Sequence, residues 1–229
     1  MSNIGIIIFA RMKSKRLYGK VLKRIGKKTL LEIIIKRLKK VSNKFPIIVA
    51  TSLDPSDNRI KSFCQKKKIL CFRGSLQDVY KRANDCCKKY NLKAFVRICG
   101  DRPFVDFELV RKMLFFYKSN LNKFDILTNV FPRSYPKGLT CELVSCNIFN
   151  EKIRKKLKKK EKEHIINFFY KNNSNYKIKN FKSKIKWNKK IKLSLDTQKD
   201  FEKVKKIYGF YNNNYLIKSS KVKKYFLNK

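Results

Sequence analysis

The first half of the chain alternates short apolar runs with stretches that carry a helical pattern. The apolar runs are residues 4–9, 46–50, 69–73 and 94–99, and the helical stretches are 29–41, 57–67, 76–90 and 106–117. The helical stretch at 29–41 opens with Thr29 and Glu32, the spacing of a capping box. Strand and helix repeated four times, with short connections, predict an α/β fold with a mostly parallel central sheet and helices on both faces.

The second half is less regular and predicts shorter elements. Strand patterns cover 125–129, 139–145, 176–181 and 191–195, and helical patterns cover 147–170 and 197–211. From Asn212 the chain is rich in Asn and Lys, which predicts either a loosely packed helix or a partly disordered tail. A chain of 229 residues without an internal repeat or a long linker fits a single domain at 1–211, followed by this tail at 212–229.

The net charge of +43 does not by itself predict a nucleic-acid partner. Of the 59 basic residues only 12 are arginine, and abundant Asn, Ile, Phe and Tyr accompany the lysines. An AT-rich coding sequence produces this pattern, and the lysines are spread along the chain. Replacement of neutral surface residues by lysine therefore explains most of the charge, and we expect no specific nucleic-acid partner. Arginine resists such drift, so its positions carry more information.

The sequence also argues against several other classes of protein. No apolar run approaches the ~20 residues that span a bilayer, so we expect no membrane insertion. The first strand begins at residue 3 or 4, which leaves no room for a secretory signal peptide. Seven cysteines without a C-x-x-C pair and a single histidine, His164, argue against a structural zinc site. We expect a reduced chain in the cytoplasm.

The loop after the first apolar run predicts a phosphate-binding site. It contains two arginines, Arg11 and Arg16, together with Ser14, Gly19 and Lys20, and a helical pattern follows. Loops between a strand and a helix hold phosphate groups in α/β proteins, because backbone N–H groups face the anion and basic side chains neutralise it. Basic residues are common everywhere in this chain, so the two arginines are the stronger part of the signal.

Two aspartates follow later apolar runs. Asp101 comes after residues 94–99 and Gly100, and Asp196 ends the run at 191–195. Each of them could simply cap the helix that follows. In combination with a basic phosphate loop, however, two aspartates are what a metal-assisted nucleotidyl transfer requires, because Mg²⁺ takes one or two carboxylates together with substrate phosphates. We therefore expect Mg²⁺ as the cofactor, with Asp101 and Asp196 as its ligands.

Taken in order, these segments resemble a known family, the sugar-activating cytidylyltransferases. The resemblance rests on six groups of residues: Ala10-Arg11-Met12 with Ser14, Arg16-Leu17 and Gly19-Lys20; Phe72-Arg73-Gly74-Ser75 with Asp78-Val79; Arg97 with Gly100-Asp101 and Pro103; Tyr135-Pro136 with Gly138-Leu139 and Glu142; Glu163-His164; and Leu195-Asp196-Thr197 with Asp200. The most similar branch is the spore coat polysaccharide biosynthesis protein F type, which is related to acylneuraminate and 3-deoxy-manno-octulosonate cytidylyltransferases. The matches run from residue 4 to about 208.

The resemblance implies a Rossmann-like nucleotide-diphospho-sugar transferase fold and, usually, a homodimer. It implies transfer of CMP from CTP to a sugar acid or related sugar, with release of pyrophosphate, for surface polysaccharide or glycan biosynthesis. Its implied nucleotide site consists of Ala10, Arg11, Ser14, Arg16, Lys20, Thr51, Arg73, Gly74, Ser75 and Gly100. Its implied catalytic residues are Arg11, Lys20 and Asp101, its metal ligands Asp101 and Asp196, and its acceptor-sugar residues Tyr135, Gly138 and Glu142.

This chain departs from the family pattern at four positions. Tyr18 replaces a proline in the first loop, and Thr140 stands where the family often has aspartate. Arg102 and Phe104 are atypical after Gly-Asp. For His164 we favour a structural or substrate-lining role over proton transfer.

Two alternatives remain open from the sequence. One is a nucleotidyltransferase that uses another nucleoside triphosphate and a sugar phosphate. The other is a non-catalytic, basic nucleic-acid-binding protein in which the motifs are relics. A comparison of the four nucleoside triphosphates distinguishes the first alternative from a cytidylyltransferase. Salt-dependent nucleic-acid retention without any nucleotide preference would support the second alternative.

Overall fold

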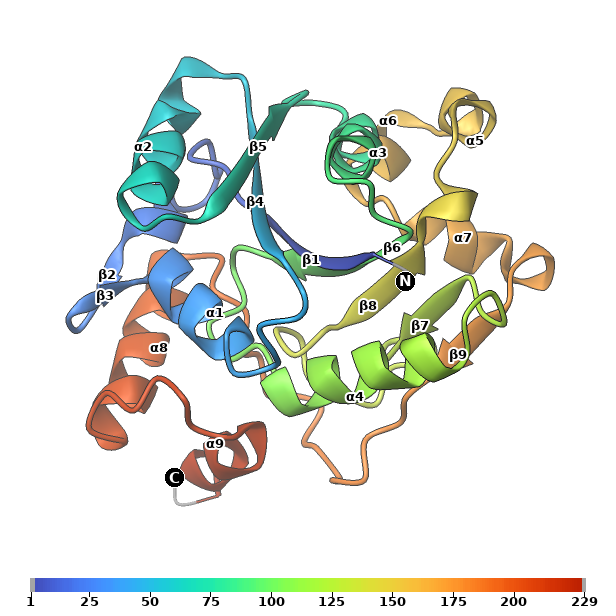
Figure 1. Ribbon diagram of the computed structural model, residues 1–229. Coiled ribbons are helices and arrows are strands. Elements are labelled where there is room, and N and C mark those ends of the chain that lie inside the picture. The colour runs from blue at the N-terminus through green and yellow to red at the C-terminus, as the bar shows by residue number, and fades with distance from the viewer. Residues whose placement is uncertain (1–2, 228–229) are drawn as a thin grey trace.

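The computed structural model describes residues 3–227 and shows a seven-stranded sheet flanked by helices (Figure 1). The strands are β1 (Ile4–Phe9), β4 (Ile47–Ser52), β5 (Leu70–Gly74), β6 (Ala94–Cys99), β7 (Ile126–Thr128), β8 (Glu142–Ser145) and β9 (Ile178–Asn180), in the spatial order β5-β4-β1-β6-β8-β7-β9. β8 is antiparallel to both of its neighbours, and every other pair is parallel. The predicted mostly parallel α/β sheet is therefore confirmed.

The helices connect these strands, and a small hairpin precedes the first of them. The helices are α1 (Leu30–Leu38), α2 (Asn58–Lys66), α3 (Val79–Lys89), α4 (Phe107–Ser119), α5 (Glu151–Lys156), α6 (Lys159–Glu163), α7 (Asn167–Lys171), α8 (Gln198–Phe210) and α9 (Ser219–Tyr225). The hairpin pairs β2 (Arg24–Ile25) with β3 (Lys28–Thr29). Thr29 and Glu32 form the predicted capping box of α1. No helix in the described range 3–227 has the length and apolarity needed to span a membrane.

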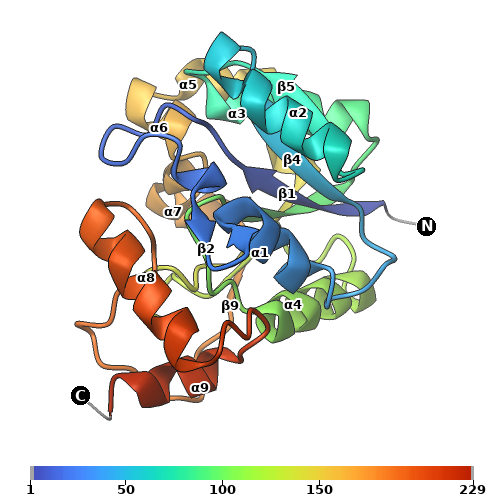
Figure 2. The ribbon, with the colours of Figure 1, turned by 90° about the vertical axis from the view of Figure 1, so that its left-hand side faces the viewer.

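Two hydrophobic cores cover the two faces of the sheet, which explains why β1 is apolar along its length. Ile6 and Ile8 belong to the core beneath α1 and α4, whereas Ile7 belongs to the core beneath α3 and α7. Side chains alternate between the faces of a strand, so a strand buried on both sides needs apolar residues throughout. Figures 1 and 2 show α1 and α4 on one side of the sheet and α3 on the other.

One predicted helix and one predicted strand are absent. Residues 147–170 form a short 3₁₀ turn and the three short helices α5, α6 and α7, because Leu157 adopts an extended backbone and is buried. The neighbouring lysines offer no apolar stripe to hold a longer helix against the core. Residues 191–195 make a single bridge, from Lys192 to Lys137, since the Leu193 and Leu195 amides bond to carbonyls of two different segments.

Several other predicted elements are shorter in the structure, because side chains take over their backbone bonds. The predicted strand 139–145 begins only at Glu142, since the Asn129 side chain bonds the Leu139 carbonyl and the Cys141 amide. The predicted helix 76–90 begins at Val79, where the Asp78 carboxylate caps it by accepting from the Lys81 amide. Competition of this kind is typical of Asn and Asp at the ends of elements.

The segment after residue 211 packs against the rest of the molecule. Tyr215, Ile217 and Val222 are buried, and α9 lies beside α8 (Figure 2). The fully buried Arg37 of α1 donates to the carbonyls of Tyr215 and Ile217, at 2.8 and 2.9 Å. These contacts differ from the loose packing or partial disorder that the composition predicted for 212–227. The division of the chain into 1–211 and 212–229 stays a prediction.

Candidate active site

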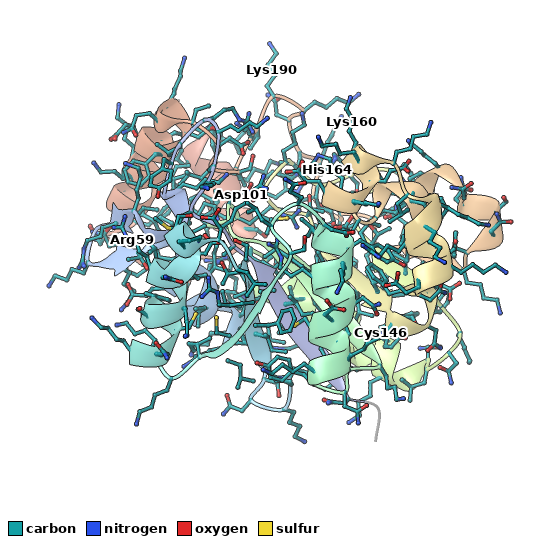
Figure 3. All side chains as sticks on the ribbon, turned by 90° about the horizontal axis from the view of Figure 1, so that it is seen from above. Arg59, Asp101, Cys146, Lys160, His164 and Lys190 are labelled. Atoms are coloured by element: carbon teal, nitrogen blue, oxygen red, sulfur yellow. The ribbon has the colours of Figure 1, made fainter. Side chains whose placement is uncertain are left out.

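A cavity of about 380 Å³ lies at the carboxyl ends of β1 and β6. Ligands of parallel α/β sheets bind at this edge, because the loops that follow neighbouring strands meet there. The predicted site residues that line it are Ala10, Arg11, Ser14, Arg16, Lys20, Gly100, Asp101 and Asp196. Asp101 and His164, which also lines the cavity, lie near the centre of the view in Figure 3.

The phosphate loop is anchored from inside, so its charged side chains are left for the cavity. Met12 is buried, its amide donates to Asp57 at 2.6 Å, and its carbonyl accepts from the amides of Ser14 and Gly19. Gly19 adopts φ of 64°, a left-handed conformation that glycine tolerates without strain. A basic loop is thereby folded back on itself before Lys20 begins a short 3₁₀ helix.

Lys20 joins the two predicted metal ligands. Its ammonium lies 3.3 Å from Asp101 Oδ2, 3.3 Å from Asp196 Oδ1 and 2.8 Å from the Leu195 carbonyl. Arg16 also pairs with Asp196 Oδ1, at 3.0 Å. Burial alone would raise the pKa of Asp196, but the neighbouring cations, Lys20 first among them, outweigh it and hold that pKa below its usual value. Asp196 is thus kept ionised.

The donor set formed by Asp101 and Asp196 fits a divalent cation that also binds phosphate. Two carboxylates reach one point from separate segments, 81 and 176 residues away from Lys20. Nowhere in residues 3–227, this place included, do three His, Cys, Asp or Glu side chains cluster closely enough to hold a metal ion without further ligands. Mg²⁺ commonly accepts two carboxylates and completes its octahedron with substrate phosphates and water. The identity of the ion as Mg²⁺ stays a prediction.

Arg82 is a cavity residue that the sequence motifs did not identify. It projects from α3, is 2% exposed and donates to the Ser75 carbonyl at 3.1 Å. Its Nε atom is buried and finds no partner among the described residues. Burial and the nearby Arg11 cation lower the pKa of Arg82 to about 10. A signal was available in the sequence, because an arginine on the buried face of an amphipathic helix is unusual.

Four of the predicted nucleotide-site residues lie outside the cavity lining. Thr51 is fully buried, and its hydroxyl has no hydrogen-bond partner in the described part of the chain. Arg73 donates to the carbonyls of Ser52 and Asp54 and to the Asn58 side chain. Gly74 and Ser75 touch the cavity only through Arg82, which bonds Ser75 and whose Cγ would lie 3.0 Å from a Cβ on Gly74. Their roles near the base and ribose stay predictions.

A second cavity of about 280 Å³ adjoins the first and shares Arg97 and His164 with it. Glu142 lines this second cavity, is 3% exposed and accepts from Arg97 at 2.5 Å and from the Tyr170 hydroxyl at 2.9 Å. Burial opposes its ionisation, but Arg97 and Arg102 outweigh that cost and lower the pKa of Glu142. Glu142 is therefore a buried carboxylate held by neighbouring arginines.

The other two predicted acceptor residues line neither cavity. Tyr135 is half-buried against the core, and Gly138 lies under residues 193–194. A Cβ on Gly138 would come within 2.3 Å of the Leu193 and Ser194 backbone, and its φ is 105°. Gly138 thus permits a close backbone approach. Its role toward an acceptor, like that of Tyr135, stays a prediction.

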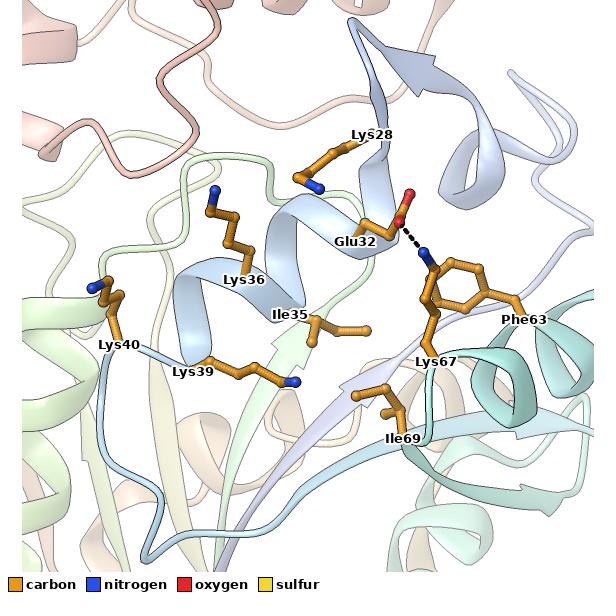
Figure 4. A pocket seen from close by; sticks show the side chains of 9 residues that line it. All are labelled: Lys28, Glu32, Ile35, Lys36, Lys39, Lys40, Phe63, Lys67 and Ile69. Atoms are coloured by element: carbon orange, nitrogen blue, oxygen red, sulfur yellow. Dashed lines mark ion pairs between the residues drawn. The ribbon is translucent and has the colours of Figure 1, made fainter.

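A third and larger cavity, about 550 Å³, lies between α1 and α2 (Figure 4). Its lining residues are Lys28, Glu32, Ile35, Lys36, Lys39, Lys40, Phe63, Lys67 and Ile69. The one acid there, Glu32, is engaged by Lys67 at 2.8 Å and by the α1 cap. No motif residue lines this cavity, so we place the candidate active site in the first two.

Comparison with known proteins agrees with the arrangement of fold and site. The family model for cytidylyltransferases matches residues 5–225. The chain therefore belongs to the cytidylyltransferase family, and the protein is an enzyme of this class.

Individual relatives share most of their length with this chain. It is 34% identical to the uncharacterized protein MJ1063 of Methanocaldococcus jannaschii over 203 residues, covering 88% of this chain and 81% of the relative. It is 28% identical to the spore coat polysaccharide biosynthesis protein SpsF of Bacillus subtilis, covering 91% and 87%. Among solved structures, a cytidylyltransferase from Leptospira borgpetersenii superposes with a TM-score of 0.92 at 27% identity, covering 100% of this chain and 95% of that one.

Proposed function

We propose that this enzyme transfers CMP from CTP to a hydroxyl group of a sugar acid or related sugar and releases pyrophosphate. One observation carries the proposal: the basic loop and two aspartates from separate segments line one cavity, joined at Lys20. The arginines and the lysine suit a polyanion such as a triphosphate, and the carboxylates beside them suit a cation bound to its phosphates. Membership of the cytidylyltransferase family supports CTP as the donor.

Arg11, Arg16 and Lys20 would bind the triphosphate and neutralise its charge. In the structure Arg11 pairs with Glu163 at 2.6 Å and Arg16 with Asp196 at 3.0 Å, and both arginine side chains are partly exposed. They can therefore turn to phosphate without disturbing the core. Ser14 adds a hydroxyl donor. Ala10 and Gly100 line the cavity with small or absent side chains, which would let the nucleotide approach the backbone.

The acceptor hydroxyl would attack the α-phosphorus in line, with pyrophosphate as the leaving group. The protein contributes mainly positioning and charge stabilisation to such a reaction. Arg11 and Lys20 would stabilise charge on the phosphates, and Asp101 with Asp196 would hold Mg²⁺. When bound, that ion neutralises phosphate charge. Lys20 lies 3.3 Å from both carboxylates in the structure, so it is placed to act beside them on the phosphates.

The remaining residues would select the two substrates. Arg82, with its free Nε, and the segment Arg73, Gly74 and Ser75 would face the base and ribose, together with Thr51. Glu142 would accept hydrogen bonds from acceptor hydroxyls, and Tyr135 and Gly138 would shape that side. We further propose that the enzyme is a cytoplasmic homodimer that acts in surface polysaccharide biosynthesis. The name of the Bacillus subtilis relative supports the last of these points, the role in polysaccharide biosynthesis.

Purified protein tests this function directly. With CTP, Mg²⁺ and a panel of sugar acids, we expect pyrophosphate release, and we expect CTP to raise the melting temperature more than ATP, GTP or UTP. If the protein released no pyrophosphate and CTP did not raise its melting temperature, the proposal would be refuted. A preference for UTP or GTP with a sugar phosphate would instead indicate the alternative nucleotidyltransferase.

A further inference from the structure

Asp57 is a buried carboxylate that no ion pair neutralises within residues 3–227. It is 1% exposed and ends a short 3₁₀ turn, Pro55–Asp57, which follows β4 and leads into α2. None of the ion pairs among the described residues includes it. Taking a carboxylate out of water is costly unless hydrogen bonds replace the solvent. The hydrogen bonds of Asp57 therefore indicate what this side chain does.

Both oxygens of the Asp57 carboxylate accept a hydrogen bond from a backbone amide. Oδ1 accepts from the Met12 amide at 2.6 Å, and Oδ2 accepts from the Ser52 amide at 3.0 Å and from the Ser52 hydroxyl. Met12 belongs to the phosphate loop after β1, and Ser52 is the last residue of β4, which pairs with β1. One side chain thus ties the phosphate loop to the end of the neighbouring strand.

The bond to Asp57 fixes the orientation of Met12 inside the phosphate loop. The Met12 carbonyl accepts from the Gly19 amide at 2.9 Å, so the loop closes on this residue. Lys15 and Arg16 lie between these two positions and line the first cavity. Their amides donate to no backbone carbonyl within residues 3–227. Amides left in this way can bind phosphate oxygens, so the fold of the loop matters for binding an anion.

A negative charge behind the phosphate loop is unfavourable for a triphosphate, because like charges repel. A carboxylate has one chemical advantage over a neutral asparagine, since both of its oxygens accept hydrogen bonds, whereas an amide offers one acceptor and one donor group. Asp57 faces a backbone donor at each oxygen, from Met12 and from Ser52. Asparagine could not satisfy both donors. The shape of the loop therefore explains the aspartate, and its charge does not.

We propose that Asp57 is a positioning residue for the triphosphate, which acts through the Met12 amide and holds the phosphate loop in the conformation that binds CTP. The inference rests on the proposed function and specifies how its nucleotide loop is held. Asp57 lines neither cavity of the candidate site, so it acts through the loop and not by contact with substrate. Asp54, at the start of the same turn, offers a matched comparison, because its carboxylate reaches the loop only through the exposed side chain of Lys13, at 2.7 Å.

Steady-state kinetics on D57N tests the proposal, with D54N as the control. In D57N one of the two backbone amides faces an NH₂ group, so the loop is held less firmly. We expect the KM for CTP to rise about 10- to 100-fold, with kcat and the KM for the acceptor little changed. D54N removes only a surface ion pair and should keep the KM for CTP within about twofold of the wild type. A loss of stability alone would lower the amount of active enzyme and leave the KM of the folded molecules unchanged.

Amide hydrogen exchange in the wild type, followed by NMR, tests the same bond and does not depend on whether D57N folds. We expect the Met12 amide to exchange far more slowly than the Lys15 amide of the same loop. Equal exchange at these two amides overturns the proposal, as does a folded D57N with an unchanged KM for CTP, whatever its kcat. A wild type that releases no pyrophosphate and shows no CTP-dependent thermal shift refutes the proposed function itself, so the two failures are distinguishable.

Discussion

Arg11 is a residue whose contribution to activity and to stability can be separated. Its one ion pair among residues 3–227, with Glu163, is partly exposed on both sides, and such pairs contribute about 0–1 kcal/mol to folding. If Arg11 stabilises phosphate charge in the transition state, Arg11→Ala lowers kcat by about 10²–10³. Pyrophosphate release measures the loss, and thermal unfolding should change little. Arg24→Ala, which removes an exposed arginine bonded to the Lys27 carbonyl, is the control. Full activity in Arg11→Ala would contradict the assigned role.

Substitution of Arg82 should not lower the melting temperature, unlike substitution of most buried residues. Arg82 is 2% exposed, and within the described chain its guanidinium forms no ion pair and its Nε has no hydrogen-bond partner. A buried charge without a carboxylate partner is costly to desolvate, so an apolar side chain of similar length in its place can be neutral or stabilising. We therefore expect Arg82→Met to melt at an unchanged or higher temperature and to bind CTP more weakly, as measured by calorimetry. A lower melting temperature with unaltered CTP affinity would assign Arg82 to the fold alone.

These residues also show where sequence reasoning on the site stops. Arg11, Lys20 and Asp101 lie in loops after β1 and β6, so their convergence could be predicted from the common edge of these strands. Asp196 was predicted to join them after a strand at 191–195, and it lies in the same cavity although that segment makes only a single bridge. Arg82 lies inside a helix, and only its position on the buried face of α3 could have marked it. The hydrogen bonds of Arg102 and Arg133 to Thr140 could not be predicted, because they join segments whose spacing depends on an irregular loop.

At the scale of elements, Glu142 joins β8 to β6 and α7 through Arg97 and Tyr170. Its pKa is held below its ordinary value of 4.5, so its contribution to stability is present above that pH and is lost as the pH falls further. Glu142→Gln leaves Arg97 buried without its partner, and we expect about 3–5 kcal/mol less stability at neutral pH. Urea unfolding of the wild type and of Glu142→Gln at several pH values measures the free energy of unfolding of each. The difference between the two free energies should become smaller below about pH 4.5. Glu108→Gln, at an exposed pair with Lys218, is the control. A difference in unfolding free energy that stays the same across pH would show that the charge of Glu142 does not stabilise the fold.

Two glycines provide a matched test of how the loop at 132–138 is held. A Cβ on Gly138 would overlap the Leu193–Ser194 backbone, and φ is 105°, whereas Gly209 lies within α8 and has nothing within 4 Å. Gly138→Ala should cost more than ~3 kcal/mol, because the backbone must separate. Gly209→Ala should stabilise by about 0.5–1 kcal/mol through helix propensity. Chemical unfolding measures both, and equal effects would show that the close approach at Gly138 does not matter.

Elements differed from prediction wherever side chains or charge competed with regular backbone bonds. The four strand–helix units of the first half could be predicted, since burial on both faces of β1 demands continuous apolar residues. The helix ends at Leu157 and His164 could not be predicted, because the helical pattern at 147–170 contains no proline or glycine to mark them. The first of these ends depends on the burial of the Leu157 side chain in the core.

For the whole molecule, the chain after residue 211 is the feature that composition described least well. An Asn- and Lys-rich sequence suggests weak packing, yet Tyr215, Ile217 and Val222 are buried. The sequence signal for this burial was the spacing of the apolar residues within the polar segment. The carbonyls of Tyr215 and Ile217 satisfy Arg37, whose guanidinium is wholly buried and also bonds Val105. The segment therefore supplies polar partners as well as apolar surface.

Truncation after Tyr211 tests whether residues 1–211 are a self-sufficient domain. It removes two acceptors from Arg37 and leaves the Val105 carbonyl, and a buried charge that loses partners costs up to about 3–5 kcal/mol. For a chain of this size each kcal/mol lowers Tm by about 2–4 °C, so we expect a fall of about 6–20 °C, plus the loss from Tyr215 and Ile217. Adding Arg37→Met to the truncated chain should recover part of the loss, because the unpaired charge is gone. The same substitution in the full chain should destabilise it, since it leaves the Tyr215 and Ile217 carbonyls without a donor. An unchanged Tm after truncation would instead establish 1–211 as the independent folding unit.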